Sequence, residues 1–242
     1  MPDLIGHPIP RTMWPFTKKQ TLLSSGALRG WTDWHCHILP GVDDGVQTLA
    51  ESLEALRWYE EQGVSEVWLT PHIMEDIPNT PEGLQSRFTE LQEAYEGSIL
   101  LHLAAEHMID SLFEERLANE QVLAIGEYLL VETSYFNPPL DLDGMLRRIK
   151  DRGYRPLLAH PERYTYMSWP DYERLHEAGV AFQLNLPSLS GAYGPDARRK
   201  AERLLKAGWY DRSGSDLHRL SAFRRATQER IPSTILEHIH LQ

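Results

Sequence analysis

The segment Glu61-Gln62-Gly63-Val64-Ser65-Glu66-Val67-Trp68-Leu69-Thr70-Pro71-His72 contains the unit from which most of the chain is built. A charged helical stretch ends at Gly63, an apolar strand follows, and a histidine stands where that strand ends. Glycine adopts a positive φ at low cost, so it ends a helix at such a position. The segment therefore predicts a helix, a strand and a polar side chain at the carboxyl end of the strand.

The same order recurs along the chain. Four more glycines stand between a charged helical stretch and an apolar strand: Gly97, Gly153, Gly179 and Gly208. Helix starts are marked by Thr80 before Pro81 and by Ser168 before Trp169-Pro170, and a helix opens at Gly194-Pro195. A polar cap followed by proline in the first turn is typical of a helix N-terminus. Helices and strands are thus expected to alternate.

Seven strands are expected, near residues 31–37, 64–71, 99–106, 128–134, 156–160, 180–186 and 209–215. Alternation with helices favours parallel pairing through right-handed crossovers. No glycine-rich phosphate loop follows the first strand, which weakens the case for an open nucleotide-binding sheet. We therefore expect an α/β barrel in one domain, residues 30–242, after a proline-rich N-terminal extension, residues 1–29.

The composition excludes several classes of protein. Of the 242 residues, 41% are hydrophobic and 24% are charged, which is ordinary for a globular domain. The formal net charge of −11 argues against a nucleic-acid-binding protein. One cysteine allows no internal disulfide, and the chain shows neither an apolar run of membrane-spanning length nor a signal peptide. A cytoplasmic location without a membrane span is expected.

Metal-capable side chains stand at the carboxyl ends of six of the seven expected strands. His35 and His37 lie two residues apart on the first strand, so their side chains point to one face, together with Asp33. The others follow later strands: His72, Glu106, Glu132, His160, Asp216 and His218. Barrel enzymes build their active sites at this end from residues of several strands. The shared position predicts a common metal site.

Histidine and carboxylate ligands without thiolate favour zinc, iron or manganese. The loop Pro40–Gly45 adds Asp43 and Asp44 at the same mouth, and spacing alone leaves open which of the two is a ligand. Nine ligands exceed the needs of one tetrahedral ion, so two or three ions are expected. Cys36 points to the face opposite the histidines and has no arginine six positions later, so a thiol-dependent phosphatase is not indicated.

These motifs together resemble the polymerase and histidinol phosphatase (PHP) superfamily. The motifs that carry the resemblance are Asp33-x-His35-x-His37, Pro40-Gly41-x-Asp43-Asp44-Gly45, Thr70-Pro71-His72, Ala105-Glu106, Glu132, His160-Pro161-Glu162-Arg163 and Gly214-Ser215-Asp216-x-His218. Within the superfamily the chain is most similar to the bacterial protein-tyrosine phosphatases that accompany capsule and exopolysaccharide synthesis. The similarity runs from about Gly30 to Phe223.

The resemblance implies a distorted seven-stranded (β/α) barrel with a trinuclear site, with manganese favoured over iron and zinc. Carried over, one ion takes His35, His37 and Asp216, a second takes His160, and a third takes Asp44, His72 and His218. Glu106 and Glu132 complete and bridge the first two ions. An arginine that holds phosphate falls on Arg163. For a second arginine the family spacing lands near Phe223, which leaves Arg219 and Arg224 as candidates; Arg224 is our choice.

The implied activity is hydrolysis of phosphotyrosine on a protein, with a bacterial tyrosine kinase as the expected partner. A hydroxide held between two metal ions is a strong nucleophile at neutral pH, and Arg163 pairs with phosphoryl oxygens. Two alternatives stay open: a small-molecule phosphomonoesterase of the histidinol phosphatase type, and a catalytically silent module that binds a kinase. A homo-oligomer is compatible with each of these functions.

Overall fold

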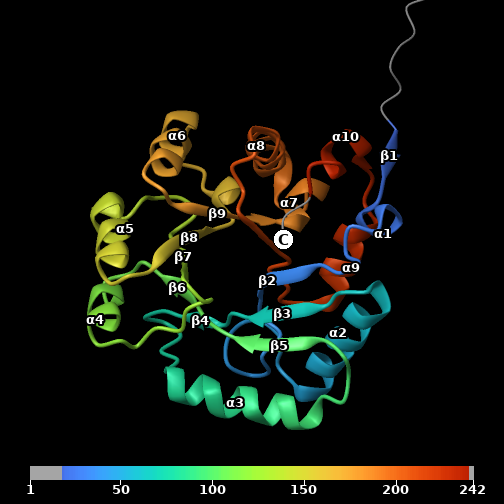
Figure 1. Ribbon diagram of the computed structural model, residues 1–242, viewed down its shortest axis with the longest axis horizontal. Coiled ribbons are helices and arrows are strands. Elements are labelled where there is room, and N and C mark those ends of the chain that lie inside the picture. The colour runs from blue at the N-terminus through green and yellow to red at the C-terminus, as the bar shows by residue number, and fades with distance from the viewer. Residues whose placement is uncertain (1–17, 240–242) are drawn as a thin grey trace, which may run out of the picture.

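A computed structural model describes residues 18–239, in which outer helices surround parallel strands (Figure 1). Nine strands form two parallel sheets. A six-stranded curled sheet has the order β10-β9-β8-β7-β6-β4, and a three-stranded sheet has the order β2-β3-β5. The strands are β2 (Thr32–Cys36), β3 (Glu66–Leu69), β4 (His72–Ile73), β5 (Leu100–Leu103), β6 (Glu106–Met108), β7 (Tyr128–Glu132), β8 (Arg155–Ala159), β9 (Ala181–Asn185) and β10 (Arg212–Gly214).

Two of the seven expected strands are interrupted. The segment 64–71 ends as β3 and resumes as β4 after Thr70-Pro71, because proline has no N–H to donate to a neighbouring strand. The segment 99–106 likewise divides into β5 and β6. Pairing changes at these breaks: β3 joins β2 and β5, whereas β4 joins β6. The breaks thus divide the strands between two sheets.

Backbone hydrogen bonds also connect the two sheets where β2 meets the segment after β10. The amide of Asp216 donates to the carbonyl of His35 at 2.7 Å, and the amide of His37 donates to the carbonyl of Leu217 at 3.0 Å. These bonds place the carboxyl end of β2 directly beside the segment that follows β10.

The helices begin and end largely where the sequence predicts. Thr80 caps α3, and its hydroxyl accepts from the amide of Gly83. Ser168 caps α6, and α8 begins at Gly194. The main helices are α2 (Leu49–Gln62), α3 (Pro81–Ala94), α4 (Phe113–Ala118), α5 (Leu142–Asp151), α6 (Trp169–Glu177), α7 (Leu186–Ser190), α8 (Gly194–Ala207) and α9 (Leu220–Gln228). A single turn of 3₁₀ helix spans Pro161–Arg163.

The glycine stops are confirmed with one exception. Gly63 and Gly208 end their helices with φ of 82° and 70°. Gly97 does not adopt a positive φ, and α3 ends earlier, at Ala94. A Cβ at Gly97 would meet only the ends of the Glu60 and Tyr95 side chains, which can move aside, so close packing does not require glycine there. The prediction of a helix stop at Gly97 is therefore wrong.

The first described residues pack on the rest of the molecule. β1 (Lys19–Gln20) pairs antiparallel with β11 (Ile231–Pro232), and α1 (Leu22–Ser25) contributes the buried Leu22. The chain continues into α10 (Ser233–Leu236). Residues 1–17 of the expected extension lie outside the described residues. Among residues 18–239, no helix has both the length and the apolar character needed to cross a bilayer.

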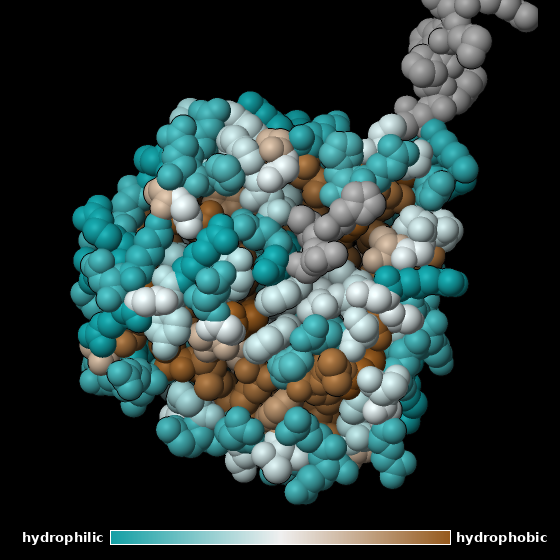
Figure 2. Space-filling model, in the orientation of Figure 1, coloured by the Kyte–Doolittle hydropathy of each residue, from teal (hydrophilic) through white to brown (hydrophobic). Residues whose placement is uncertain are grey.

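The apolar core has two parts. The larger packs the sheets against the helices and includes Leu129 and Val131 of β7. The smaller takes the alternate residues of the same strand, Tyr128 and Leu130, with Trp34 and Trp68 packed against them. Since alternate residues of a strand face opposite sides, the smaller cluster lies on the side away from the helices. Figure 2 shows hydrophilic residues over the outer helices and hydrophobic residues gathered between them.

Candidate metal centre

All nine predicted ligands lie in one cluster at the carboxyl ends of the strands. Each has a nitrogen or oxygen atom within 3.8 Å of another member. Asp44 and His218 are the accessible members, with side chains 67% and 30% exposed, and the other seven are buried. The cluster is therefore a polar site that opens to solvent along one side.

Glu106 links the strands at the centre of the cluster. Its Oε2 lies 3.2 Å from Nε2 of His35, 3.3 Å from Nε2 of His37 and 3.2 Å from Nδ1 of His72. Its Oε1 lies 3.0 Å from Nε2 of His160. One carboxylate thus faces four imidazoles, a position that suits a bridging ligand.

The outer ring nitrogens of His35 and His37 are held by acceptors. Nδ1 of His35 lies 3.0 Å from Oε1 of Gln183, and Nδ1 of His37 lies 2.7 Å from Oδ2 of Asp43. Both oxygens accept hydrogen bonds, so each Nδ1 is the donor, and each Nε2 is the ring nitrogen directed at the cluster. The two Nε2 atoms are 3.1 Å apart and face the same space. This arrangement orients histidines as metal ligands.

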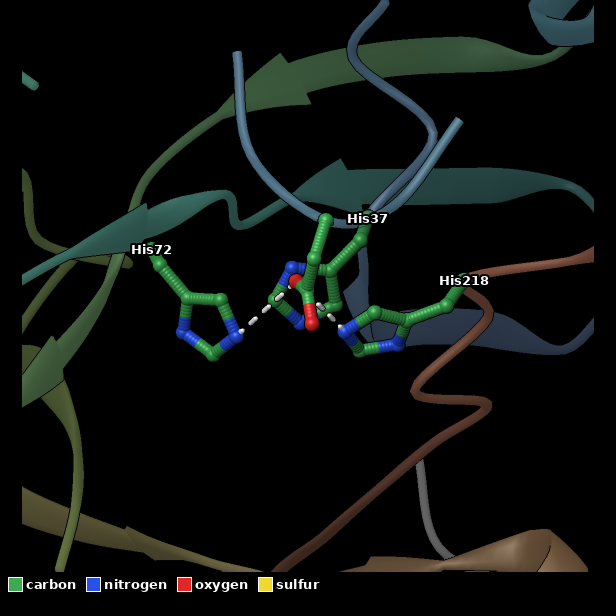
Figure 3. A group of neighbouring side chains, drawn as sticks. His37, His72 and His218 are labelled. Carbon is green, nitrogen blue, oxygen red and sulfur yellow. Dashed lines mark ion pairs between the residues drawn. The ribbon is translucent and has the colours of Figure 1, made fainter. Parts of the chain in front are cut away.

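The structure places Asp43 and Asp44 in different surroundings. Asp43 bonds His37, and its carboxylate also accepts from the amides of Gly45 and His72. Asp44 reaches toward the histidines, with Oδ1 3.2 Å from Nε2 of His218 and 3.6 Å from Nε2 of His72. Figure 3 shows His72 and His218 converging on either side of His37. Asp43 is therefore placed to orient His37, and Asp44 to act as a ligand.

Asp33 does not contact the imidazole rings. Its carboxylate accepts from the hydroxyl of Tyr59 at 2.6 Å, the hydroxyl of Ser215 at 2.6 Å, and the amides of Ser215 and His35. Burial raises the pKa of Asp33 to about 6, against these hydrogen bonds. Asp33 thus fixes the backbone of β2 and of the segment after β10, and through them the positions of His35 and Asp216.

Local backbone conformation also positions the ligands. His160 and Asp216 both have positive φ, 33° and 50°, a region that side chains other than glycine seldom adopt. Gly214 lies against β2, where a Cβ would come within 2.5 Å of the Cβ of His35. Gly45 is equally close to His37, since a Cβ there would lie 2.3 Å from the carbonyl oxygen of His37. Each of these turns thus packs closely against a predicted ligand or contains one.

Arg163 lies at the edge of the cluster. Its Nη1 donates to Oδ2 of Asp216 at 2.5 Å, and its guanidinium lies between two rings, 4.4 Å from the centroid of Tyr135 and 4.1 Å from that of Tyr193. The neighbouring Glu162 does not pair with it. Glu162 is buried and accepts from Asn185, Ser188 and Tyr210. The charge of Arg163 therefore stays directed at the site.

Arg224, the predicted second arginine, lies elsewhere. Its guanidinium is 5.7 Å from the ring centroid of Trp58, and it does not line the cavity at the cluster. Arg219, the other candidate, does line that cavity, as does Arg225. Neighbouring helical residues point about 100° apart, so Arg224 and Arg225 of α9 face different directions.

The cavity at the cluster has a volume of about 900 Å³. Asp44, Glu106, Glu132, Asp216 and His218 line its floor with Arg163, and Met74, Ile77 and Met108 contribute apolar wall. Such a volume accepts a side chain with its flanking groups. Cys36 is buried and donates to the carbonyl of Trp68, and the buried His107 contacts the backbone of Leu123, so neither takes part in the cluster.

The carboxylates and imidazoles of the cluster shift one another's pKa values. Burial lowers the pKa of His35, but the charges of Glu106 and Asp216 outweigh it and raise the value to about 9. Against burial, hydrogen bonds to Asp216 and Asp44 raise the pKa of His218 to about 11. Burial and the charge of Glu106 raise the pKa of Glu132 to about 7. Protons and cations therefore compete for the same atoms.

The residues present fit divalent metal ions. Three groups each bring ligand atoms within 4.8 Å of one another: His37, Asp44, His72 and His218; His35, His37 and Glu106; and His72, Glu106 and Glu132. Within residues 18–239, Oε2 of Glu106 and Nδ1 of His72 and His160 are buried without a hydrogen-bond partner. Buried polar atoms rarely stay unsatisfied, and imidazole with carboxylate suits first-row transition metals.

Several residues of the site do not follow from the sequence motifs. Gln183 fixes His35 and also accepts from the backbone amide of His160. Asn185 donates to Oδ2 of Asp216 at 2.9 Å. Both lie on β9, the one expected strand without a metal-capable residue at its end. Two polar residues within that otherwise apolar strand were the sequence feature that could have indicated a role in the site.

The chain resembles known proteins over most of its length. A family model described as capsular polysaccharide synthesis, CpsB/CapC, matches residues 31–235. Tyrosine-protein phosphatase YwqE of Bacillus subtilis is 30% identical over 205 residues, which cover 81% of each chain. The putative tyrosine-protein phosphatase CapC of Staphylococcus aureus is 27% identical over 198 residues, 78% of this chain and 77% of that protein.

Solved structures agree with the sequence relatives. A structure reported with YwqE from B. subtilis and CpsB from Streptococcus pneumoniae, described as unique metal-dependent tyrosine phosphatases, matches with a TM-score of 0.77 and 28% identity. The match covers 87% of this chain and 88% of that chain. A phosphotriesterase homology protein from Escherichia coli, with a TM-score of 0.51 and 13% identity, shares the fold alone.

Proposed function

The chain belongs to the CpsB/CapC family of capsular polysaccharide synthesis proteins, and on that premise we propose that it is a metal-dependent protein-tyrosine phosphatase. The substrate is phosphotyrosine on a protein linked to capsule or exopolysaccharide synthesis. One observation carries the proposal: the nine predicted ligands lie in one cluster, and six of them line one cavity together with Arg163.

The proposed site holds three divalent ions, with manganese favoured. His35, His37 and Asp216 would hold the first ion, His160 the second, and Asp44, His72 and His218 the third, and Glu106 and Glu132 would serve as shared carboxylate ligands. The contact of Glu106 with four imidazoles supports its bridging role. When bound, such ions polarise phosphoryl oxygens and lower the pKa of water.

The chain's own residues bind and orient the phosphoryl group. Arg163 uses Nη1 for Asp216, which leaves its other donors for phosphoryl oxygens. The Tyr135 and Tyr193 rings hold the guanidinium plane in place. The pKa of a phenol is about 10, so a phenolate leaving group needs less help from a general acid than an alkoxide does.

We propose Arg219 in place of Arg224 as the second phosphate contact, because Arg219 lines the cavity and Arg224 does not. Arg219→Gln is expected to raise KM for a phosphotyrosine peptide several-fold. Arg224→Gln serves as the matched comparison from the same helix region, and steady-state kinetics of the two variants decide between them. A larger rise in KM for Arg224→Gln would restore the original choice.

We propose one domain, residues 30–242, in which the seven strand segments close into a distorted (β/α) barrel. The bonds that link Asp216 with His35 and Leu217 with His37 support closure. The proposed partner is a bacterial tyrosine kinase, and the proposed location is the cytoplasm.

Hydrolysis of a phosphotyrosine peptide by purified protein tests the function. Chelation and dialysis should abolish turnover and added Mn²⁺ should restore it, whereas thiol alkylation should leave it intact because Cys36 is buried. Full activity after metal removal would contradict the proposal. A strong preference for small alkyl phosphates would favour the histidinol phosphatase reading instead. Absence of any turnover with metals bound would favour a silent kinase-binding module.

A further inference from the structure

Tyr193 is the most exposed of the tyrosine and phenylalanine residues that line the cavity. It lies in the short link between α7 and α8, is 38% exposed, and lines the cavity together with Arg163 and Asp216. Exposed aromatic rings carry a cost in water, so a ring on a cavity wall is a candidate contact for a ligand.

The surroundings of Tyr193 differ from those of Tyr135, its counterpart across Arg163. Tyr135 also contacts the rings of His160 and Tyr164, with centroids 5.6 Å and 6.1 Å away. Tyr193 has Arg163 over its ring at 4.1 Å, and within the described residues no other aromatic ring stacks on it. Its exposed surface therefore belongs to the cavity wall and not to an aromatic cluster.

The link that carries Tyr193 is shaped to present it. Gly191 and Gly194, on either side, have φ of 86° and 90°. These two turns reverse the chain between helices and project the intervening segment at the cavity, where Gly191 and Ala192 also line the wall. The guanidinium of Arg163 then fixes the ring from one face.

We propose that Tyr193 is the contact for the phenyl ring of the substrate and gives the site its preference for aryl over alkyl phosphates. This inference rests on the proposed function, since it assigns the ring that accompanies the phosphoryl group. The geometry supplies both parts: Arg163 beside the ligand cluster for the phosphoryl group, and Tyr193, stacked on Arg163, for the ring attached to it. An alkyl phosphate offers no flat face to Tyr193.

Binding of two phosphonates to the metal-loaded protein tests the inference without requiring turnover. Phenylphosphonate and methylphosphonate share the charged group and differ in the ring. Calorimetry should show that wild type prefers phenylphosphonate, that Tyr193→Leu reduces this preference about three- to tenfold, and that Tyr193→Phe retains it. A merely structural role for Tyr193 would weaken both ligands equally.

The result that overturns the inference is an unchanged ratio of the two affinities in Tyr193→Leu. Equal weakening of both phosphonates also overturns it, because Tyr193 would then act only through Arg163. Failure of the proposed function gives a different result: wild type would bind phenylphosphonate preferentially but leave a phosphotyrosine peptide intact.

Discussion

The carboxyl ends of the strands and the aromatic stack closer to their amino ends use the same strands in opposite ways. His35 of β2 belongs to the ligand cluster, whereas its neighbour Trp34 stacks on Trp68, with ring centroids 6.0 Å apart and an interplanar angle of 12°. Arg212, the first residue of β10, lies 4.4 Å over the Trp34 ring. The ligand cluster concentrates charged groups that can bind a cation, whereas the stack brings aromatic rings into contact.

This difference predicts that the aromatic stack contributes mainly to the free energy of unfolding and the ligand cluster mainly to activity. In the stack, rings and cations attract one another without any further group. In the cluster, buried carboxylates and imidazoles crowd together, and one carboxylate, that of Glu106, faces four imidazoles. Substitutions at the two ends should therefore separate activity from stability, in the following order of effect.

His35→Gln should give the largest effect. Loss of an Nε2 ligand that faces Glu106 should lower kcat/KM for a phosphotyrosine peptide by about a thousandfold, similar to the loss of a main electrostatic group in other enzymes. In the metal-free protein, losing the buried contacts of His35 with Glu106 and Asp216 should also lower the free energy of unfolding, so kcat/KM is measured at a temperature where urea unfolding shows the variant to be folded. Retention of a tenth of the activity would contradict the comparison.

Trp34→Ala should lower stability and leave activity nearly unchanged. Removing a large ring from the stack should lower the free energy of unfolding by about 2–4 kcal/mol. At a temperature where the variant is folded, kcat/KM should stay within about threefold of wild type. Trp34→Phe, which keeps an aromatic ring, should lose less stability. A variant that loses activity while keeping its urea midpoint would show that the two ends are not separate.

His107 sharpens the comparison within β6, because it follows Glu106 and faces away from the cluster. Burial lowers its pKa to about 4, below the ordinary value of 6.5, so the unfolded chain binds the proton more tightly. Its contribution to stability is present above pH 6.5 and is lost as the pH falls from 6.5 to 4, by about 3 kcal/mol at most. His107→Gln should flatten this part of the pH profile of urea unfolding, with both proteins in chelator. Parallel profiles would contradict this origin.

Arg212→Gln should give the smallest effect. Loss of the cation over Trp34 should cost about 1 kcal/mol in urea unfolding and leave kcat/KM unchanged. Arg147→Gln on the exposed side of α5 is the matched change of charge, and it should leave stability within about 0.5 kcal/mol. Equal losses in both variants would assign the effect to net charge instead.

The order of helices and strands could be read from the sequence because its signals are local. A charged stretch, a glycine and an apolar run mark each unit, and strand ends place the ligands. The breaks at Pro71 and between Ala104 and Ala105 were not predicted, since an apolar run does not reveal which strand pairs with which. The pairing of β1 with β11 joins segments more than two hundred residues apart and has no local signal.

The convergence of the nine predicted ligands could be read from the sequence for the same reason, but the residues that orient them could not. His35 and Gln183 are separated by 148 positions, and only the fold shows that one orients the other. The two rings that enclose Arg163 come from separate loops, at Tyr135 and Tyr193. Arg224 was chosen by spacing alone, and the direction of a helical side chain is not fixed by spacing from a preceding motif.

The left-handed backbone of His160 and Asp216 has a consequence for how this sequence evolves. Glycine would adopt both conformations at lower cost, so the residues best for folding and best for the reaction differ at these two positions. A library selected for thermal stability alone should drift toward glycine there, and one selected for turnover should retain histidine and aspartate. At these two positions, the residue that favours thermal stability differs from the residue that favours turnover.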